Sequence, residues 1–337
     1  MMNRLILFLC FVWMIPCSEL LSVSWENVVL MWSAGGAKAK DIVCIGSMKM
    51  RTCQMVAQAG DLTSEIREVM KGKKAQVGVA VILNGKDTVT VNNDCRYPML
   101  SVFKFHQALT VADSLQRNGL PLDAEIFIRK EELRQDTYSP LRDRYPEGGI
   151  VLPVKELLKY TLQLSDNNAC DILFARSGGP QATDRYIRSL GGVRFAVVAD
   201  ENAMHKDLSL CYRNWTTPLE AAVLFQNLFT RRLFGKPYQD FLKRTLVECE
   251  TGKDRLVKPL ENTGAVIGHK TGTGDLNAKG QIIGLNDVGF VCLPDGNYYA
   301  IAVFIKDSEE NSHVTAQLIA DISEAVYRYV VQNMSVK

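Results

Sequence analysis

The segment VGVAVILNGKDTVTV, residues 77–91, places two runs rich in β-branched residues on either side of Asn84-Gly85. Such runs favour β-strands. An Asn-Gly pair readily adopts the positive φ angles of a tight two-residue turn. The segment therefore predicts a β-hairpin, and we expect this hairpin to join strands from elsewhere in the chain in one sheet.

Beyond this hairpin, β-branched and aromatic runs occur again near the C-terminus and predict strands at residues 265–270, 282–292 and 298–305. Between the two groups of strands the periodicity predicts helices at residues 101–116, 153–164, 168–175, 181–190, 218–229 and 238–247. Pro153 and Pro218 suit the first turn of a helix, where a missing N–H group costs nothing. Two terminal helices are also predicted, at residues 62–71 and along the apolar stripe from Leu318 to Val330.

This order of elements predicts an α/β fold with one antiparallel sheet. The terminal helices would cover a face of the sheet, and the central helices would form an all-helical subdomain. We expect the sheet part to comprise residues 62–98 and 263–337, and the helical part residues 99–262.

The composition is that of an ordinary globular protein, with 337 residues of which 47% are hydrophobic and 23% charged. The net charge is only +2, and Lys and Arg form no run of five or more, which argues against nucleic-acid binding. The nine cysteines include no C-x-x-C pair, and the four histidines show no metal-ligand spacing. We therefore expect neither a dense disulfide framework nor a metal site, and no other cofactor.

The N-terminus has the pattern of a secretory signal, because Arg4 precedes eleven apolar residues, Leu5–Ile15. A run of eleven residues is too short to span a bilayer, which takes about 20. We expect residues 1–18 to be a signal peptide, residues 19–61 carry no pattern that assigns them, and the main domain begins at residue 62. A buried strand or helix is the alternative reading of the apolar run. The expected location is periplasmic or secreted.

Ser101-Val-Phe-Lys104 begins one of the predicted helices, and a spacing of three residues puts the two side chains on one helical face. A serine hydroxyl is a weak nucleophile that needs a neighbouring base. Lys104 could be that base if its surroundings held it neutral, or it could act through its charge. The positive end of the helix dipole would favour an oxyanion nearby. The pair alone is also compatible with a capping serine and a solvated lysine.

Two further polar motifs follow. Ser165-Asp-Asn167 comes 64 residues after Ser101, just past a predicted helix, where an exposed loop is expected. Lys270-Thr-Gly-Thr273 follows a β-branched run and is therefore expected on a strand. Each motif could be a simple helix cap or strand end, but three such motifs in this order rarely occur together by chance.

The three motifs together resemble the signature of class A β-lactamases and penicillin-binding proteins. The resemblance covers about residues 62–335. It implies that Ser101 is the nucleophile, that Lys104 assists it and that Ser165 passes a proton to the lactam nitrogen. The implied oxyanion hole consists of two backbone N–H groups, those of Ser101 and Thr273. The implied substrate-binding residues are Tyr138, Asn167, His205, Arg255, Lys270, Thr271, Gly272 and Thr273.

Fast hydrolysis of the acyl-serine separates a β-lactamase from a transpeptidase. In the family a glutamate on a long loop, about 36 residues past the serine of the second motif, directs a water to the ester. Glu201 lies 36 residues after Ser165. The resemblance therefore implies an enzyme that hydrolyses β-lactam antibiotics and confers resistance to them. We expect its only partner to be the small-molecule substrate and the protein to be a monomer.

Three positions refine the resemblance. His205 stands four residues after Glu201, where Asn is commonest in class A, and this resembles one extended-spectrum branch. The strand after the third motif lacks the usual arginine, but Arg255 matches the alternative arginine of that branch. Tyr138 resembles the aromatic residue at the rim of the site. A surface arginine and a partly buried loop tyrosine are the plain alternatives for these two positions.

Other functions stay open. A D,D-peptidase or transpeptidase would share the three motifs without the loop glutamate, so Glu201 argues against it. A penicillin-sensing domain would keep Ser101 without a deacylation loop and would usually adjoin a membrane span. A serine-dependent glutaminase is a third alternative, which nothing in the sequence favours.

Overall fold

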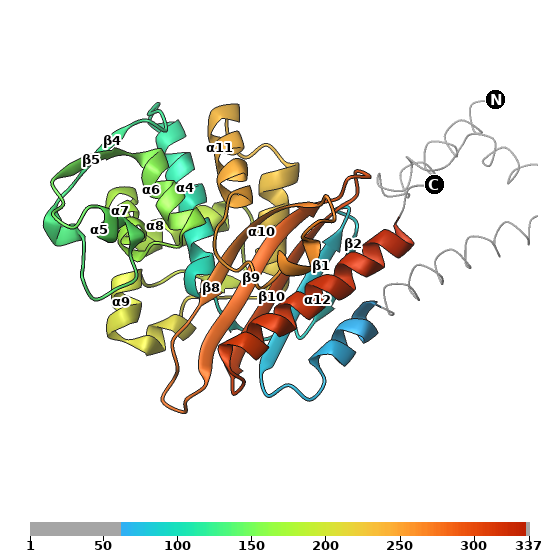
Figure 1. Ribbon diagram of the computed structural model, residues 1–337. Coiled ribbons are helices and arrows are strands. Elements are labelled where there is room, and N and C mark those ends of the chain that lie inside the picture. The colour runs from blue at the N-terminus through green and yellow to red at the C-terminus, as the bar shows by residue number, and fades with distance from the viewer. Residues whose placement is uncertain (1–61, 335–337) are drawn as a thin grey trace, which may run out of the picture. The chain divides into compact units, whose positions relative to one another are not determined.

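The structure of the chain, a computed structural model, describes residues 62–334 (Figure 1). The expected signal peptide and the unassigned segment 19–61 lie outside the described residues. The described chain begins with a helix at residues 62–70 and ends with helix α12 (Ser312–Asn333), as predicted. No helix in this part of the chain is long and apolar enough to cross a membrane.

The main sheet is antiparallel and has five strands in the order β2-β1-β10-β9-β8. These strands are β1 (Gln76–Leu83), β2 (Asp87–Val91), β8 (Val266–Thr273), β9 (Ile282–Cys292) and β10 (Tyr298–Ser308). Because β1 pairs with β10, the N-terminal hairpin and the C-terminal strands lie in one sheet, which confirms the predicted fold class. β8 is an edge strand, and its last four residues are the Lys270–Thr273 motif.

The hairpin turn is the predicted two-residue turn. Asn84 and Gly85 have φ angles of +47° and +68°. The Asn84 side chain also ties this turn to the turn before β10, because its Oδ1 accepts the N–H of Tyr298 at 2.8 Å and its Nδ2 donates to Oδ1 of Asn297 at 2.8 Å. The turn residues therefore fix the register between the hairpin and the C-terminal strands.

Both faces of the sheet are covered, so side chains on both sides of its strands are buried. In β1, Ala80 and Ile82 pack into the core shared with the helical part, while Val79 and Val81 pack into the core beneath α12. Helix α12 and the helix at residues 62–70 lie on that second face, and α10 (Pro218–Thr230) lies on the first (Figure 1). Burial of each large side chain, such as Val79, Val81 or Ile82, stabilises the fold by about 1.5–3 kcal/mol.

The helical part is built around α4 (Phe103–Arg117), which packs against helices on several sides and is buried over most of its length. Its other helices are α5 (Pro140–Arg144), α6 (Val154–Gln163), α7 (Asn167–Ser177), α8 (Gly179–Ser189), α9 (Glu201–Lys206) and α11 (Lys236–Val247). A helix that is buried nearly all round can place polar side chains such as Lys104 out of contact with water. The buried position of α4 therefore determines the environment of Lys104 in the site.

Three local details differ from the predictions. Ser101 lies in the 3₁₀ helix η1 (Leu100–Val102), immediately before α4, rather than in the α-helix itself. Pro153 ends β5 (Ile150–Pro153) and caps α6 instead of standing in its first turn. Outside the main sheet there are also short strands that were not predicted, since two to four residues are too few to show an alternating pattern. These are β3 (Tyr97–Pro98), β4 (Glu125–Ile128), β6 (Phe195–Ala196) and β7 (Trp215–Thr216), besides β5.

We expect Ile319→Ala to lower the free energy of unfolding by about 2–5 kcal/mol, because it leaves a cavity between α12 and the sheet. Ile319 is fully buried in that core. Val247→Ala, at the exposed last residue of α11, is the control and should change it by less than about 0.5 kcal/mol. Urea unfolding of both variants provides the measurement, and equal losses would contradict the packing argument.

Candidate active site

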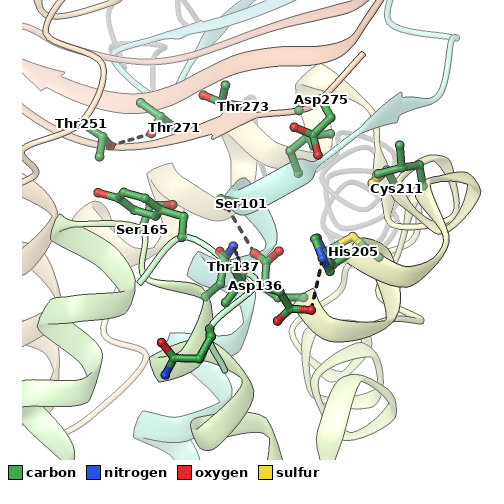
Figure 2. A pocket seen from close by; sticks show the side chains of 18 of the residues that line it. Ser101, Asp136, Thr137, Ser165, His205, Cys211, Thr251, Thr271, Thr273 and Asp275 are labelled. Atoms are coloured by element: carbon green, nitrogen blue, oxygen red, sulfur yellow. Dashed lines mark hydrogen bonds and ion pairs between the residues drawn. The ribbon is translucent and has the colours of Figure 1, made fainter. Parts of the chain in front are cut away.

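A cavity of about 710 Å³ lies where the end of β8 faces the helical part (Figure 2). Nine of the predicted site residues line it, namely Ser101, Tyr138, Ser165, Asn167, Glu201, His205, Arg255, Thr271 and Thr273. The other three, Lys104, Lys270 and Gly272, lie directly behind this wall and contact its residues. The fold therefore brings together all of the residues that the sequence motifs singled out.

Lys104 connects the segments of the site. Its Nζ donates to Ser101 Oγ at 3.0 Å and lies 2.8 Å from Oε1 of Glu201. It also donates to the carbonyl oxygen of Ser165 at 2.7 Å and to Oδ1 of Asn167 at 2.6 Å. The side chain is fully buried, so these partners replace the water that an ammonium group needs. The alternative of a solvated lysine is therefore wrong.

The backbone before Ser101 is strained and held in place. Leu100 has a φ of +48°, a conformation that costs energy for a side chain of this kind. Asn286, on β9, donates from Nδ2 to the carbonyl oxygens of Pro98 at 2.8 Å and Met99 at 3.2 Å. The sheet thus fixes the turn that presents the Ser101 hydroxyl to the cavity.

Gly272 lets the edge strand approach this turn. A Cβ atom at Gly272 would lie 2.6 Å from the carbonyl oxygen of Met99, a backbone atom that cannot move aside. Only glycine therefore allows the end of β8 to pack against η1. Both Ser101 and Thr273 then face the same cavity, as the implied oxyanion hole requires (Figure 2).

Ser165 faces Lys270 across the cavity wall. Lys270 Nζ donates to Ser165 Oγ at 3.0 Å and to the carbonyl oxygen of Thr271 at 2.9 Å. Burial lowers the pKa of Lys270 to about 7, with nearby Lys104 also lowering it and the negative charges of Cys249, Asp287 and Glu201 opposing the change. Near neutral pH, the charged and neutral forms of such a lysine therefore differ little in free energy.

Asp166 between these residues is buried, which differs from the exposed loop expected there. Its carboxylate caps α7 by accepting the N–H of Ala169 at 2.8 Å, and it accepts the N–H of Leu141 at 2.7 Å and the hydroxyl of Ser139 at 3.0 Å. The motif is thus a helix cap as well as a source of site residues. Burial raises the pKa of Asp166 against the effect of these hydrogen bonds.

Glu201 is the first residue of α9, and its side chain reaches Ser101. Ser101 Oγ donates to Glu201 Oε1 at 3.3 Å, and the same oxygen is the one paired with Lys104. The Glu201 side chain is 11% exposed, so it belongs to the wall of the cavity rather than to the solvated surface.

Arg255 is a buried side chain of the cavity wall, at 7% exposure, rather than a surface arginine. Its guanidinium donates to Thr273 Oγ1 at 2.7 Å and to the carbonyl oxygens of Gly272 at 3.1 Å and Asn286 at 2.9 Å. It therefore braces the end of β8 and adds a positive charge beside Thr273. Among residues 62–334, no group of histidine, cysteine or acidic side chains is arranged to hold a metal ion.

Residues 61–330 match the sequence profile of the beta-lactamase enzyme family. The chain belongs to this family. It is 41% identical over 273 residues to a beta-lactamase of Phocaeicola vulgatus, a stretch covering 80% of this chain and 85% of that protein. It is 36% identical over 280 residues to the extended-spectrum beta-lactamase PER-1 of Pseudomonas aeruginosa, covering 83% and 90% of the two chains.

Solved structures agree with the sequence relatives. The crystal structure of the TLA-1 extended-spectrum beta-lactamase matches with a TM-score of 0.78 and 41% identity, over 81% of this chain and 99% of that one. A class A beta-lactamase of Bacteroides cellulosilyticus matches with the same TM-score of 0.78 at 40% identity, over 82% and 99%. The protein is thus a class A serine β-lactamase, which hydrolyses the β-lactam ring and confers resistance.

The Glu201 loop of this β-lactamase is held by Asp171, a residue that belongs to none of the sequence motifs and was not predicted. Asp171, one helical turn after Asn167 on α7, accepts the N–H of Glu201 through Oδ1 at 2.9 Å and that of Asn202 through Oδ2 at 3.0 Å. Burial, reinforced by the charges of Asp200 and Glu201, raises the pKa of Asp171 to about 7. In the sequence, Asp171 can be recognised as an acidic residue among the apolar residues of a predicted helix.

The rim of the β-lactamase cavity carries Tyr138 and His205. Tyr138 is 59% exposed, as an aromatic residue at the edge of the site should be, and its carbonyl oxygen accepts the N–H of Asn167 at 3.2 Å. His205 Nε2 lies 3.4 Å from Oδ2 of Asp136 (Figure 2). Asp136 and the cavity-lining Asp275 were not predicted, because neither belongs to a motif.

We expect Asp171→Ala to slow deacylation by tenfold or more while acylation changes less, because Glu201 loses the contacts that fix its backbone. A stopped-flow burst assay with nitrocefin separates the two steps. Asp94→Ala, which removes a carboxylate whose side chain is 99% exposed, is the control and should behave like the wild type. Equal slowing of both steps would show that Asp171 supports the whole site rather than the glutamate loop.

Proposed function

We propose that this enzyme opens β-lactams with Ser101 as nucleophile and hydrolyses the acyl-enzyme with Glu201 as general base. The observation that carries this assignment is the position of one carboxylate oxygen. Glu201 Oε1 lies 3.3 Å from Ser101 Oγ and 2.8 Å from Lys104 Nζ. A base in this position reaches both the nucleophile and the space where a water would attack the ester.

Acylation begins at the Ser101 hydroxyl. It donates to Glu201 and accepts from Lys104, so its proton can leave toward the carboxylate while the ammonium stabilises the developing alkoxide. Oγ forms a bond to the lactam carbonyl carbon, and the backbone N–H groups of Ser101 and Thr273 stabilise the oxyanion. The C–N bond then breaks, and Ser165 protonates the nitrogen. Lys270, 3.0 Å from Ser165 Oγ, stabilises the negative charge left on that oxygen. The proton that Glu201 took from Ser101 then replaces the one that Ser165 gave up, so Glu201 is a carboxylate again before deacylation.

Deacylation uses the same groups to hydrolyse the ester at Ser101. Glu201 accepts a proton from a water, the hydroxide attacks the ester carbon, and the C–O bond to Ser101 breaks. Ser101 regains a proton and the opened, inactive antibiotic leaves. Lys104 Nζ, 2.8 Å from Glu201 Oε1, compensates the charge of the carboxylate in a largely buried setting.

The residues proposed to bind the substrate carboxylate lie in the part of the cavity wall formed by the end of β8 and Arg255. Lys270, Thr271, Thr273 and Arg255 gather hydroxyls and positive charge at the end of β8, where a β-lactam carboxylate would accept charge-assisted hydrogen bonds of about 1.5–3 kcal/mol each. Asn167 would bind the side-chain amide, and Tyr138 and His205 would contact the substrate at the rim. The site is complete within one chain, which supports a monomer.

We propose that the mature protein acts outside the cytoplasm, where β-lactams meet cell-wall enzymes. Support comes from Arg4 followed by eleven apolar residues, Leu5–Ile15. Expressed with its own N-terminus, the protein should be found in the periplasmic or culture fraction, with residues 1–18 removed as shown by intact mass. A full-length chain that stays in the cytoplasmic fraction would contradict export.

Glu201→Gln keeps the shape of the side chain but cannot accept the proton of the attacking water. General-base help contributes about 10²–10⁴-fold, so deacylation should slow by that factor. Acylation should slow less than deacylation, because Lys104 Nζ, 3.0 Å from Ser101 Oγ, remains available to take the serine proton. We expect one burst of nitrocefin hydrolysis, then near silence, with the intact mass raised by one ligand for minutes.

Ser101→Ala is the matched control and should give neither burst nor adduct. Normal turnover of Glu201→Gln would overturn its assignment as base. If the variant shows no burst, Glu201 is required for acylation as well, which its hydrogen bond from Ser101 allows.

A further inference from the structure

Residues 134–138, which we call the rim loop, form part of the cavity wall although they are neither helix nor strand. Four of them line the cavity, namely Gln135, Asp136, Thr137 and Tyr138. Asp136 and Thr137 lie on the side of the helical part, across the cavity from Thr271 and Thr273 of β8 (Figure 2). Because a loop of this kind lacks the hydrogen bonds of a helix or sheet, other contacts must hold its backbone.

Arg142, on α5, holds the backbone of the rim loop. Its Nη1 donates to the carbonyl oxygens of Thr137 at 2.6 Å, Gln135 at 3.0 Å and Arg134 at 3.1 Å. Nη1 carries two hydrogens, so one of them is shared between two carbonyls. The three carbonyls converge on one positive charge, and hydrogen bonds from a charged donor are the stronger kind. The loop is therefore folded around this guanidinium.

The guanidinium is itself fixed from its other side. Its Nε and Nη2 donate to Asp143 Oδ1 at 3.0 and 2.7 Å, and the Arg142 side chain is only 15% exposed. The backbone N–H of Arg142 donates to Ser139 Oγ at 3.1 Å, and the Ser139 hydroxyl donates to the buried carboxylate of Asp166 at 3.0 Å. The aspartate of the second sequence motif therefore helps to place Arg142.

Asn167 connects the rim loop to the catalytic groups. Its Nδ2 donates to Thr137 Oγ1 at 2.9 Å, and its Oδ1 accepts from Lys104 Nζ at 2.6 Å. Its backbone N–H donates to the carbonyl oxygen of Tyr138 at 3.2 Å. A displaced rim loop would therefore shift Tyr138 and remove a partner of the Asn167 amide, and these are residues proposed to contact the side chain of the substrate.

We propose that Arg142 is a positioning residue that determines how well the enzyme recognises the acyl side chain of a β-lactam. Arg142 does not line the cavity, and it acts by fixing the rim loop so that Tyr138 and Asn167 meet the side-chain amide. The proposal rests on the substrate role proposed for those two residues. Because Arg142 contacts none of the groups that make or break bonds, its loss should weaken side-chain binding more than it slows the chemical steps.

Two substrates with the same bicyclic nucleus isolate this contribution. Benzylpenicillin carries an acyl side chain, whereas aminopenicillanic acid, the penicillin nucleus with a free amine, carries none. Arg142→Met keeps the aliphatic stem of the side chain and removes its donors. It should raise KM for benzylpenicillin by about tenfold, with kcat less affected, because a loop that moves by about 1 Å misplaces the groups that bind the substrate. KM for aminopenicillanic acid should change little.

Arg142→Lys tests whether the charged donor is what matters. Lysine keeps a positive charge and places three donors on one nitrogen, although its stem is shorter. Its KM for benzylpenicillin should therefore lie between the values for the wild type and Arg142→Met.

Arg117→Met is the matched control. Arg117 is the last residue of α4, its side chain is 68% exposed, and it pairs with Asp113 at 2.6 Å without lining the cavity. This variant should leave both KM values unchanged. An unchanged KM for benzylpenicillin in Arg142→Met, or an equal rise in KM for both substrates, would overturn the proposal.

Tyr138→Ala separates this inference from the proposed function. If that variant loses the preference for benzylpenicillin over aminopenicillanic acid, the rim loop binds the side chain, and an unchanged Arg142→Met then counts against Arg142 alone. If the preference survives in both variants, the substrate role of the rim loop fails and the proposal fails with it.

Trypsin gives a readout that does not depend on catalysis. Trypsin cleaves after arginine, and the carbonyl of the bond between Arg134 and Gln135 is one of the three that Arg142 holds. Folded Arg142→Met should be cleaved at this bond faster than the wild type, because cleavage requires local opening of the loop, and the masses of the fragments identify the bond. Arg117→Met should be cleaved there at the wild-type rate. Equal rates in Arg142→Met and the wild type would show that the rim loop keeps its fold without Arg142, which would contradict the proposal.

Discussion

The buried Lys104 ammonium is the interaction around which the site is organised. Four groups surround it, from Ser101, the carbonyl of Ser165, Asn167 and Glu201, and they come from three separate segments of the chain. Because the side chain has no contact with water, loss of any one segment would leave an unpaired charge in the interior. The need to satisfy one cation therefore fixes where α4, the start of α7 and α9 meet.

The sheet and the helical part supply different things to this arrangement. The sheet supplies rigid backbone, since Asn286 on β9 holds the strained turn before Ser101 and Gly272 on β8 lets the edge strand approach it. The helical part supplies the ionisable side chains and buries them. Catalysis by preorganised dipoles requires both, because groups that must move into place lose much of their effect.

Charge in the cavity is shared between two halves. Lys104 and Glu201 form one pair near the nucleophile, and Lys270, Arg255 and His269 form a second, more positive region at the end of β8. A substrate that brings a carboxylate complements the second region, which is a common way to orient a reactive bond against a nucleophile. Asp287, behind this wall, raises the pKa of Lys270 through its negative charge, against the larger effect of burial.

The main helices and strands and the twelve candidate site residues could be predicted from the sequence alone. The hairpin at residues 77–91, the apolar stripe of α12 and the three motifs are local patterns, and each depends on spacings of two, three or four residues along one segment. Tertiary structure alone decided the contacts between segments. Asp171 holding the Glu201 loop and Asp136 beside His205 join residues that are 30 or more positions apart, and neither aspartate belongs to a motif. It also decided burial, since Asp166 was expected on an exposed loop and is enclosed by Ser139, Leu141 and Ala169. Burial and long-range pairing depend on how the elements pack, and no periodicity within one element records that packing.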